Sequence, residues 1–506
     1  MMAVFPRFDD FRKTYEAGRP GVVWTSLVAD LDTPVSALMK LGRGEPMSFL
    51  LESVEGGAVR GRYSIIGLRP DLVWRARGNR PEINRRARTA PDVFEPADGD
   101  TLASLRALVA ESLIELPPEL PPMAAGLIGY FGYDMIRLIE RLPDVNPDRL
   151  DVPDALFMRP TLMAIFDSVK DVITVVTPVR PEEGLSARAA YARAEERLNE
   201  AVVDFERSVN VSPAPVADLA PLPEPVSNLT KAEYFAIVEK AKEYIRAGDI
   251  FQVVPSQRFS LPFRLPPLAL YRALRRTNPS PFMFYLNLGD FAAVGSSPEI
   301  LVRLRDGKVT IRPIAGTRPR GKTPEEDLSL EKDLLSDPKE LAEHLMLLDL
   351  GRNDVGRVSR IGTVKVTEKN VIERYSHVMH IVSNVEGEID PAHDAIDALL
   401  GGFPAGTVSG APKVRAMEII DELEPEKRNL YGGGVGYFSA NGSMDACIAL
   451  RTAVIKNGTM YVQAGGGVVA DSDPELEYQE TVNKSRALIR AAEEAVRFAS
   501  SGERGQ

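Results

Sequence analysis

The sequence predicts an α+β fold built mainly on antiparallel sheet. Short apolar runs with the two-residue period of half-buried strands recur along the chain, interspersed with segments of helical period. Asp306-Gly307, Asn441-Gly442 and Asn457-Gly458 lie between strand-like runs, and such pairs favour the tight turns of antiparallel hairpins. No regular strand–helix–strand alternation occurs, which argues against a parallel nucleotide-binding sheet.

The N-terminal region is predicted to span residues 1–207. Strand-like runs cover residues 48–54, 62–68 and 162–179, and helical periods cover residues 101–113 and 185–205. Prolines recur among small and polar residues between positions 208 and 228, a composition typical of a linker. We therefore expect residues 208–228 to join this region to a second one.

The C-terminal domain is predicted to span residues 229–498, followed by a flexible tail at 499–506. Thr230 and Glu233 have the spacing of a capping box and Gly248 is a helix stop, which predicts a helix at 231–247. Strand-like runs follow at 250–261, 282–289, 291–297, 300–316, 380–389, 432–439, 447–458 and 459–470. Further helices are predicted near 324–350 and from Asp473-Pro474 to residue 498.

The composition and net charge of the chain disfavour nucleic acids and membranes as partners. The net charge of −11 disfavours nucleic acid, and the local run of arginines is interpreted as a solvated hairpin face: Arg75, Arg77, Arg80, Arg85, Arg86 and Arg88. No apolar run reaches the length of a membrane span, and the N-terminus lacks the apolar stretch of a signal peptide. We expect no nucleic-acid partner, no membrane association and a cytoplasmic location.

Cys447 is the one cysteine of the chain, so an internal disulfide and a thiolate metal cluster are excluded. Its neighbours, MDACIALRT, have the pattern of a buried strand. A packed thiol is therefore favoured over a nucleophile.

One motif suggests an ATPase. Residues 316–323 (GTRPRGKT) fit the phosphate-binding pattern G-x-x-x-x-G-K-[ST], and residues 345–349 (LMLLD) resemble the apolar run that ends in a magnesium-binding acid. However, Pro319 has no N–H for a phosphate, and Thr323-Pro324 predicts a helix that begins too late. Glu325, Glu326 and Asp327 then add negative charge where a triphosphate would lie, so this hypothesis is disfavoured.

Two predicted helices each carry a pair of acids on one face, Glu340 with Glu343 and Glu477 with Glu480. If the pairs faced each other, their oxygens would suit Mg²⁺. Such pairs are more often solvated helix surface, and Glu480 also has the spacing of an ion pair with Lys484. The glycine run at 465–467 exposes backbone beside the second helix, which favours a small polycarboxylate held through Mg²⁺.

Ordered segments along the chain carry a family resemblance. GDIFQVVPSQR, RPIAGTRPRG, EHLMLLDLGRND, SHVMHIVSNVEG, FPAGTVSGAPKVRAMEII, YGGGVGY and QAGGGVVADSDPELEYQET resemble the chorismate-utilising enzymes, most closely the large (component I) subunits of anthranilate synthases. LLESVEGGAVRGRYSIIGL extends the resemblance over nearly the whole chain. The resemblance implies two large antiparallel sheets packed as a sandwich with helices outside. It also implies a lyase that aminates chorismate with ammonia, eliminates pyruvate and yields anthranilate, the first step of tryptophan biosynthesis.

The resemblance assigns roles to individual residues. Glu343 and Glu480 match the Mg²⁺ ligands, with Glu340 and Glu477 acting through waters. Glu299 matches the acid beside the leaving hydroxyl, His380 a histidine near the reacting ring, and Thr407 a hydroxyl alongside. The substrate-binding positions match Gly316, Thr317, Tyr431, Arg451, Gly465, Gly466, Gly467 and Lys484.

Two positions distinguish the relatives. Gln252 stands where the water-adding relatives carry a lysine that activates water, and an amide cannot serve as that base. Ala315 stands where aminodeoxychorismate synthases carry a lysine nucleophile, and alanine cannot form that adduct. Both residues therefore favour amination to anthranilate.

A partner and an inhibitor are also implied. The chain has no cysteine and histidine pair suited to glutamine hydrolysis, so a separate glutamine amidotransferase subunit is expected to supply ammonia within a heterotetramer. Leu51, Glu52 and Ser53 with Pro281, Phe282 and Met283 match the family's pocket for L-tryptophan, the feedback inhibitor. Phe282 replaces the commoner tyrosine, which removes a hydroxyl. A non-catalytic tryptophan-binding subunit remains the alternative.

Overall fold

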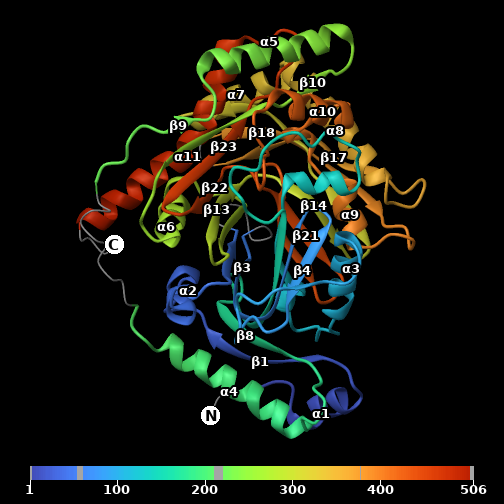
Figure 1. Cartoon of the computed structure of the whole chain (residues 1–506), viewed down its shortest axis with the longest axis vertical. Helices are drawn as coiled ribbons and strands as arrows, with labels where there is room; N and C mark the ends of the chain where they lie inside the picture. Colours follow the sequence, from blue (N-terminus) through green and yellow to red (C-terminus); the bar gives the residue numbers. More distant parts are fainter. Residues whose placement is uncertain (1–2, 54–60, 210–219, 376–377, 502–506) are drawn as a thin grey trace.

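The computed structural model describes residues 3–53, 61–209, 220–375 and 378–501 (Figure 1). Its helices are α1 Phe8–Glu16, α2 Pro34–Gly42, α3 Thr101–Glu111, α4 Ala187–Phe205, α5 Lys231–Ala247, α6 Pro267–Thr277, α7 Pro324–Ser336, α8 Pro338–Gly356, α9 Ala395–Gly401, α10 Lys413–Leu423 and α11 Pro474–Ser501. Short 3-10 helices cover Pro122–Ala124, Tyr133–Leu138 and Gly406–Val408. None of the described helices is both long and apolar enough to cross a membrane.

The strands come from both parts of the chain. Before the expected linker lie β1 Gly21–Val28, β2 Ser48–Glu52, β3 Tyr63–Arg77, β4 Arg80–Asn84, β5 Glu95–Pro96, β6 Gly126–Phe131, β7 Ala155–Asp167 and β8 Val172–Val179. After it lie β9 Val226–Ser227, β10 Gln252–Val253, β11 Ser256–Pro262, β12 Phe282–Asn287, β13 Phe291–Ser297, β14 Ile300–Arg305, β15 Lys308–Ile311, β16 Ile314–Pro319, β17 Lys365–Arg374, β18 Val378–Glu388, β19 Gly410–Ala411, β20 Gly434–Ser439, β21 Met444–Ile448, β22 Thr452–Lys456 and β23 Thr459–Gly465.

All of the described strands except β10 and β19, which pair with each other, form one continuous antiparallel network that doubles back on itself. One half runs β9-β11-β23-β22-β13-β12-β2, and the other runs β6-β20-β21-β14-β15-β18 with β16 and β17 beside β18. The long strands β3 and β7 join the halves, and their pairing shifts register between Pro70 and Leu72. A register shift of this kind bends a strand pair, which suits the turn between halves.

The two halves pack face to face with helices outside. Their shared core contains Phe284 and Val454 from the first half and Ile128 and Val435 from the second, and the ring of Tyr130 lies against that of Phe291. Helices α6 and α11 cover the outer face of the first half, and α8 and α9 cover that of the second. Helices α1 and α4 lie against β1 and β8, α2 lies against β2 and β3, and α10 lies against β10 and β19. The predicted α+β sandwich is therefore confirmed, with its two sheets joined into one network.

Strand pairing also crosses the expected boundary at 208–228. β2 pairs with β12, and β6 pairs with β20, so each half of the sandwich contains strands from both sides of the boundary. Residues 210–219 lie outside the described part of the chain. Figure 1 shows α1 and α4 at one end of the molecule and α5 at the other.

One predicted helix is confirmed and two other predicted elements differ. The helix predicted at 231–247 is α5 with the same bounds, and its Thr230–Glu233 capping box is formed. The region 324–350 holds two helices, because Asp337 ends α7 and caps α8. The run 447–458 is two strands, since Arg451 between them adopts a left-handed φ of 46°.

Candidate active site

Glu299 and Thr407 come from distant segments of the chain and are hydrogen-bonded to each other. The Thr407 hydroxyl donates to Glu299 Oε1 at 2.8 Å, and the carboxyl also accepts the backbone N–H of Ile314. Glu299 is 5% exposed. Burial raises its pKa to about 8, against the lowering effects of these two bonds and of the Lys484 charge. The group is therefore largely protonated at neutral pH and can donate a proton.

His380 lies on β18 opposite Thr317 of β16. Its Nδ1 is 3.0 Å from both the Gly316 carbonyl oxygen and Thr317 Oγ1. A carbonyl only accepts, so Nδ1 carries the hydrogen and Nε2 keeps its lone pair. Burial lowers the pKa of His380 and the Arg451 charge lowers it further, although the Gly316 bond opposes both. The ring is therefore neutral near pH 7 and offers Nε2 as a base.

The glycine run at the end of β23 makes room for converging side chains. A Cβ at Gly465 would lie 2.9 Å from Tyr431 Oη, and one at Gly466 would lie 3.0 Å from Glu477 Oε2. A Cβ at Gly467 would lie 2.4 Å from Gln252 Nε2. A larger residue at Gly466 or Gly467 would therefore displace the side chain of Glu477 or Gln252, and one at Gly465 would also meet the Pro255 carbonyl.

Lys484 and Gln252 present polar atoms beside these glycines. Lys484 Nζ donates to the Gly465 carbonyl at 2.9 Å and pairs with Glu480 Oε1 at 2.6 Å. Gln252 is 6% exposed, and its Oε1 is buried with no hydrogen-bond partner among the described residues. A buried acceptor without a partner is costly, which suits a ligand that brings an N–H group.

The two acid pairs face each other from α8 and α11. Burial raises the pKa of Glu343, and the charges of Glu340 and Glu480 raise it further. Burial likewise raises the pKa of Glu477, with Glu480 adding to the effect, while Ser472 donates to Glu477 Oε1 at 2.7 Å. These carboxylates therefore repel one another across the gap between the helices.

The donor set fits a divalent cation, although the side chains are not gathered around one point. Glu477 Oε2 is buried and has no hydrogen-bond partner among the described residues, while Glu480 bonds Lys484 and Glu340 bonds Arg318 at 3.2 Å. Within the described ranges, no three His, Cys, Asp or Glu side chains stand close enough together to hold one ion. Carboxylate oxygens are nonetheless the ligands that Mg²⁺ prefers.

Tyr431 and Arg451 flank the same region. Tyr431 is 7% exposed, its hydroxyl is bonded to the backbone of Gly465, and burial raises its pKa to about 12. Arg451 acts electrostatically on His380, and its carbonyl accepts the N–H of Ser296 at 3.1 Å. The predicted catalytic and substrate-binding residues are thus brought to one side of the C-terminal part.

The predicted inhibitor residues lie at a second place, where β2 pairs with β12. Glu52 stands opposite Met283, and Leu51 stands opposite Phe284. Ser53 directly follows β2, and its Oγ is buried with no hydrogen-bond partner in the described part of the chain. Pro281 and Met283 are buried, while Phe282 is partly exposed. The two predicted segments therefore meet across the joint between the parts of the chain.

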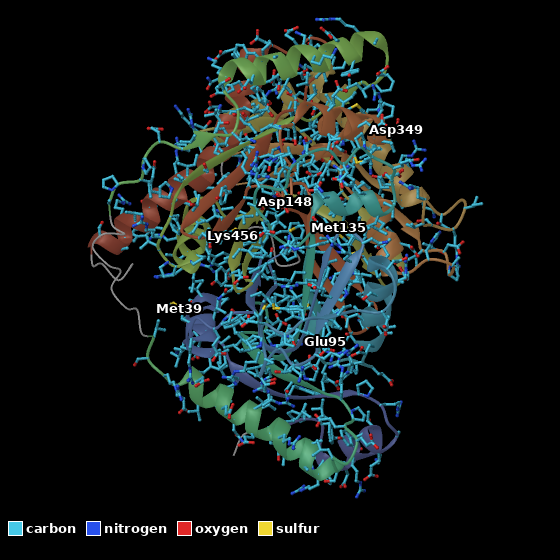
Figure 2. All side chains as sticks on the ribbon, viewed as in Figure 1. Met39, Glu95, Met135, Asp148, Asp349 and Lys456 are labelled. Carbon is cyan, nitrogen blue, oxygen red and sulfur yellow. The ribbon has the colours of Figure 1, made fainter. Side chains whose placement is uncertain are left out.

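The nucleotide-loop hypothesis is wrong. Thr323 caps α7 by accepting the N–H of Glu326. The N–H groups of Gly321 and Lys322, which a phosphate would need, donate to the carboxylates of Asp327 and Glu326 at 2.8 and 2.7 Å. Asp349, labelled in Figure 2, is exposed and forms an ion pair with Arg352.

Two further predictions concern residues outside the site. Cys447 is buried, and burial raises the pKa of its thiol to about 12, so the packed-thiol prediction is confirmed. Arginines of the basic run pair with acids: Arg75 with Glu82, Arg77 with Asp151, Arg85 with Glu111 and Arg86 with Glu95. These pairs neutralise much of the local positive charge.

Two arginines, Arg318, which is partly buried, and Arg428, which is buried, were missed by the sequence analysis. Arg318 pairs with Asp333, Asp337 and Glu340, and so ties β16 to α7 and α8. Arg428 is 2% exposed and lies behind Tyr431, with its guanidinium carbon 5.4 Å from the ring centroid. The Glu424–Arg428 spacing of four was the one local signal, and on a solvated surface the same spacing means little.

The sequence and the fold are both similar to those of known proteins. The profile of the chorismate binding enzyme family matches residues 66–490. The chain is 64% identical over 492 residues to anthranilate synthase component 1 of Cereibacter sphaeroides, covering 97% of this chain and 98% of the relative. It superposes on anthranilate synthase component I from Streptococcus pneumoniae with a TM-score of 0.73 and 37% identity, over 91% of this chain and 98% of that one. The menaquinone-specific isochorismate synthase from Escherichia coli, at 21% identity, shares the fold with a TM-score of 0.70 over 94% of this chain and 95% of that one.

Proposed function

Because the chain belongs to the chorismate binding enzymes, and within them to the anthranilate synthase component 1 proteins, we propose that it converts chorismate and ammonia into anthranilate, pyruvate and water. The observation that carries the proposal is the buried, largely protonated Glu299 bonded to Thr407. Removing the C4 hydroxyl of chorismate requires a proton at the leaving oxygen, and Glu299 has one to give at neutral pH.

The remaining groups divide the work. Lys484 and Arg451 suit the carboxylates of the substrate, since a fixed cation and free backbone N–H groups attract anions. Gln252 Oε1 accepts an N–H of the incoming ammonia, which satisfies an otherwise unpaired buried atom. Ammonia attacks C2, and His380 Nε2 is the available base for the C2 proton when pyruvate leaves.

A magnesium ion is part of the proposal. Glu343 and Glu480 would hold it, with Glu340 and Glu477 acting through waters, and the mutual repulsion of these acids and the unpaired Glu477 Oε2 support a cation here. When bound, Mg²⁺ neutralises and orients the ring carboxylate of chorismate. Lys484 must then exchange its bond to Glu480 for contact with the substrate.

The ammonia source is proposed to be a glutamine amidotransferase subunit. Glutamine hydrolysis by a cysteine needs an accessible thiolate, and Cys447 is buried with its pKa raised to about 12. The isolated chain should therefore use ammonium but not glutamine. Adding the amidotransferase partner should make glutamine a substrate, and glutamine turnover by the isolated chain would contradict the proposal.

Feedback inhibition by L-tryptophan is the regulatory part of the proposal. The pairing of β2 with β12 joins the N-terminal part of the chain to the C-terminal part, and β12 in turn pairs with β13, which ends two residues before Glu299. A ligand bound here can therefore act on both parts of the chain. The buried Ser53 Oγ, which has no hydrogen-bond partner in the part of the chain that the structure describes, supports a polar ligand at this place.

One assay tests the central claim. Purified protein with chorismate and Mg²⁺ receives either ammonium or water alone as the nucleophile, and the product is followed by anthranilate fluorescence and chromatography. Anthranilate should form with ammonium, and no isochorismate should form with water, because Gln252 is not a base. Tryptophan binding without any turnover would instead support the non-catalytic regulatory subunit.

A further inference from the structure

Arg428 is a buried cation beside the candidate active site, and all three of its guanidinium nitrogens donate hydrogen bonds. It follows α10 in the segment that leads to β20, and it is 2% exposed. Nη1 donates to the Val408 carbonyl at 2.6 Å, and Nη2 donates to the Val254 carbonyl at 2.6 Å. Nε donates to Glu424 Oε2 at 2.9 Å, and Nη2 also bonds Glu424 Oε1. One planar group therefore ties two backbone segments to one carboxylate.

Glu424 extends the same network. It is 4% exposed, and its Oε1 accepts both the N–H and the hydroxyl of Ser256 at 2.8 Å. Ser256 begins β11 and stands opposite Gly465 in the pairing with β23. The carboxylate thus fixes the start of β11, beside the glycine run of the site.

The segments held by Arg428 are those that present catalytic side chains. Val254 lies two residues after Gln252, and Val408 directly follows Thr407. The N–H of Val254 donates to the Ser409 carbonyl at 2.9 Å, so the segments are also bonded to each other. The guanidinium carbon lies 4.8 Å from the Tyr133 ring centroid and 5.4 Å from that of Tyr431.

An arginine is the side chain that this arrangement needs. Both carbonyls point into the protein interior, where an unbonded acceptor is costly. A guanidinium carries donors on three separate nitrogens in one plane, and it can reach two carbonyls and a carboxylate together. A lysine carries its donors on one atom and cannot keep all of these directions.

From this network we infer that Arg428, paired with Glu424, is a positioning residue for the amination reaction. By holding the Val254 and Val408 carbonyls, it sets the places of Gln252 Oε1 and the Thr407 hydroxyl relative to each other. Its hydrogen bonds among the described residues go to Glu424 and to the Val254 and Val408 carbonyls, and it reaches the predicted substrate-binding residues only through its contact with the Tyr431 ring. We therefore expect it to act on the geometry of reaction more than on substrate capture. This inference rests on the proposed function.

The test compares Arg428→Lys with wild type under ammonium-dependent conditions. A misplacement near 1 Å costs about 100-fold in rate, so kcat is expected to fall by about that factor. The chorismate KM should change by no more than about threefold, because the carboxylate-binding groups keep their partners. The matched control is Arg159→Lys, another buried arginine, on β7, whose side chain is 8% exposed and bonds Asp71 and Glu111.

A second variant guards against misfolding. Arg428→Gln combined with Glu424→Gln removes both charges at once, so no lone buried charge remains. The same fall in kcat at nearly constant KM is expected. If both Arg428 variants fail to fold while Arg159→Lys folds, the pair serves stability alone and the inference is overturned.

The outcomes separate the two claims. Wild-type protein that makes no anthranilate would overturn the proposed function. The positioning inference alone would be overturned if the wild type is active and Arg428→Lys has the same kcat as Arg159→Lys. It would also be overturned if the KM of Arg428→Lys rises by the same factor by which its kcat falls.

Discussion

Two buried glutamates, one at the β2–β12 joint and one in the candidate active site, are treated differently by the fold. The Glu52 side chain is 1% exposed, bonds the Tyr271 hydroxyl and forms an ion pair with Arg275 at 2.9 Å. Glu299 is 5% exposed and bonds Thr407 and the Ile314 backbone, and within the described part of the chain it forms no ion pair. One carboxylate is neutralised by a cation, and the other is neutralised by keeping its proton.

The difference separates a structural tie from a reactive group. A carboxylate bonded directly to a guanidinium has its oxygens committed and holds two strands in place. A carboxyl whose pKa burial raises to about 8 exchanges its proton in the range where enzymes work. The candidate active site also holds two buried acceptors that have no hydrogen-bond partner among the described residues, Glu477 Oε2 and Gln252 Oε1.

The largest expected effect is that of Glu480→Gln. Loss of a charged metal ligand should lower Mg²⁺-dependent turnover by about 1000-fold, since a bound metal contributes several kcal/mol to the transition state. Steady-state rates across a Mg²⁺ titration would measure it. Glu493→Gln, an exposed position on the same helix, is the control. Unchanged activity of Glu480→Gln would contradict the assignment of Glu480 as a ligand of a catalytic Mg²⁺ ion.

Glu299→Gln should lower kcat by about 100-fold, because the amide cannot give the proton. In wild type the acid form persists up to a pKa of about 8, so kcat at a fixed concentration of free ammonia should fall as pH rises through that value. The variant should lose this alkaline limb. Glu200→Gln, 57% exposed on α4, should behave as wild type. A variant with the wild-type pH profile would refute the assignment.

Glu52→Gln tests the other side of the comparison and should affect stability rather than rate. Losing the charge that faces Arg275 should lower the free energy of unfolding by about 1.5 kcal/mol, the lower end for charged hydrogen bonds, because Arg275 is 32% exposed. Chemical denaturation would measure it, with kcat near the wild-type value. A large loss of kcat without loss of stability would break the comparison.

The smallest expected effect is that of Ser53→Ala on tryptophan inhibition. One lost buried hydrogen bond should raise the half-inhibitory tryptophan concentration by about 2- to 10-fold with little change in turnover. Ser48→Ala, at the start of the strand that Ser53 follows, is the control, since its hydroxyl donates to the Glu45 carbonyl within the N-terminal part. A Ser53 variant that stays as sensitive as Ser48→Ala would count against the proposed inhibitor site.

Local signals predicted the local structure well. The Thr230–Glu233 capping box and Gly248 predicted α5 with the bounds it has, because caps act within a few residues. The break at Arg451 was missed, since a left-handed arginine has no sequence signature. The continuity of the sheet through β3 and β7 was also missed, because such pairings join residues far apart in the chain.

The site was predicted as a set of residues but not as an electrostatic environment. The resemblance supplied Glu299 and His380, whereas the raised pKa of Glu299 depends on burial that only the packed fold provides. Arg428 was missed because its carbonyl partners at Val254 and Val408 are distant in the sequence. Every residue has a backbone carbonyl, so a hydrogen bond to one cannot be predicted from a sequence motif.

The pairing of β2 with β12 and of β6 with β20 has a consequence for dissecting the protein. A fragment that ends at residue 209 and one that starts at residue 220 would each contain an incomplete sheet. Each would expose unpaired strand edges that promote aggregation. Produced together, however, the two pieces carry complementary edges and should reassemble into an active non-covalent enzyme, a split reporter in which anthranilate fluorescence signals reunion.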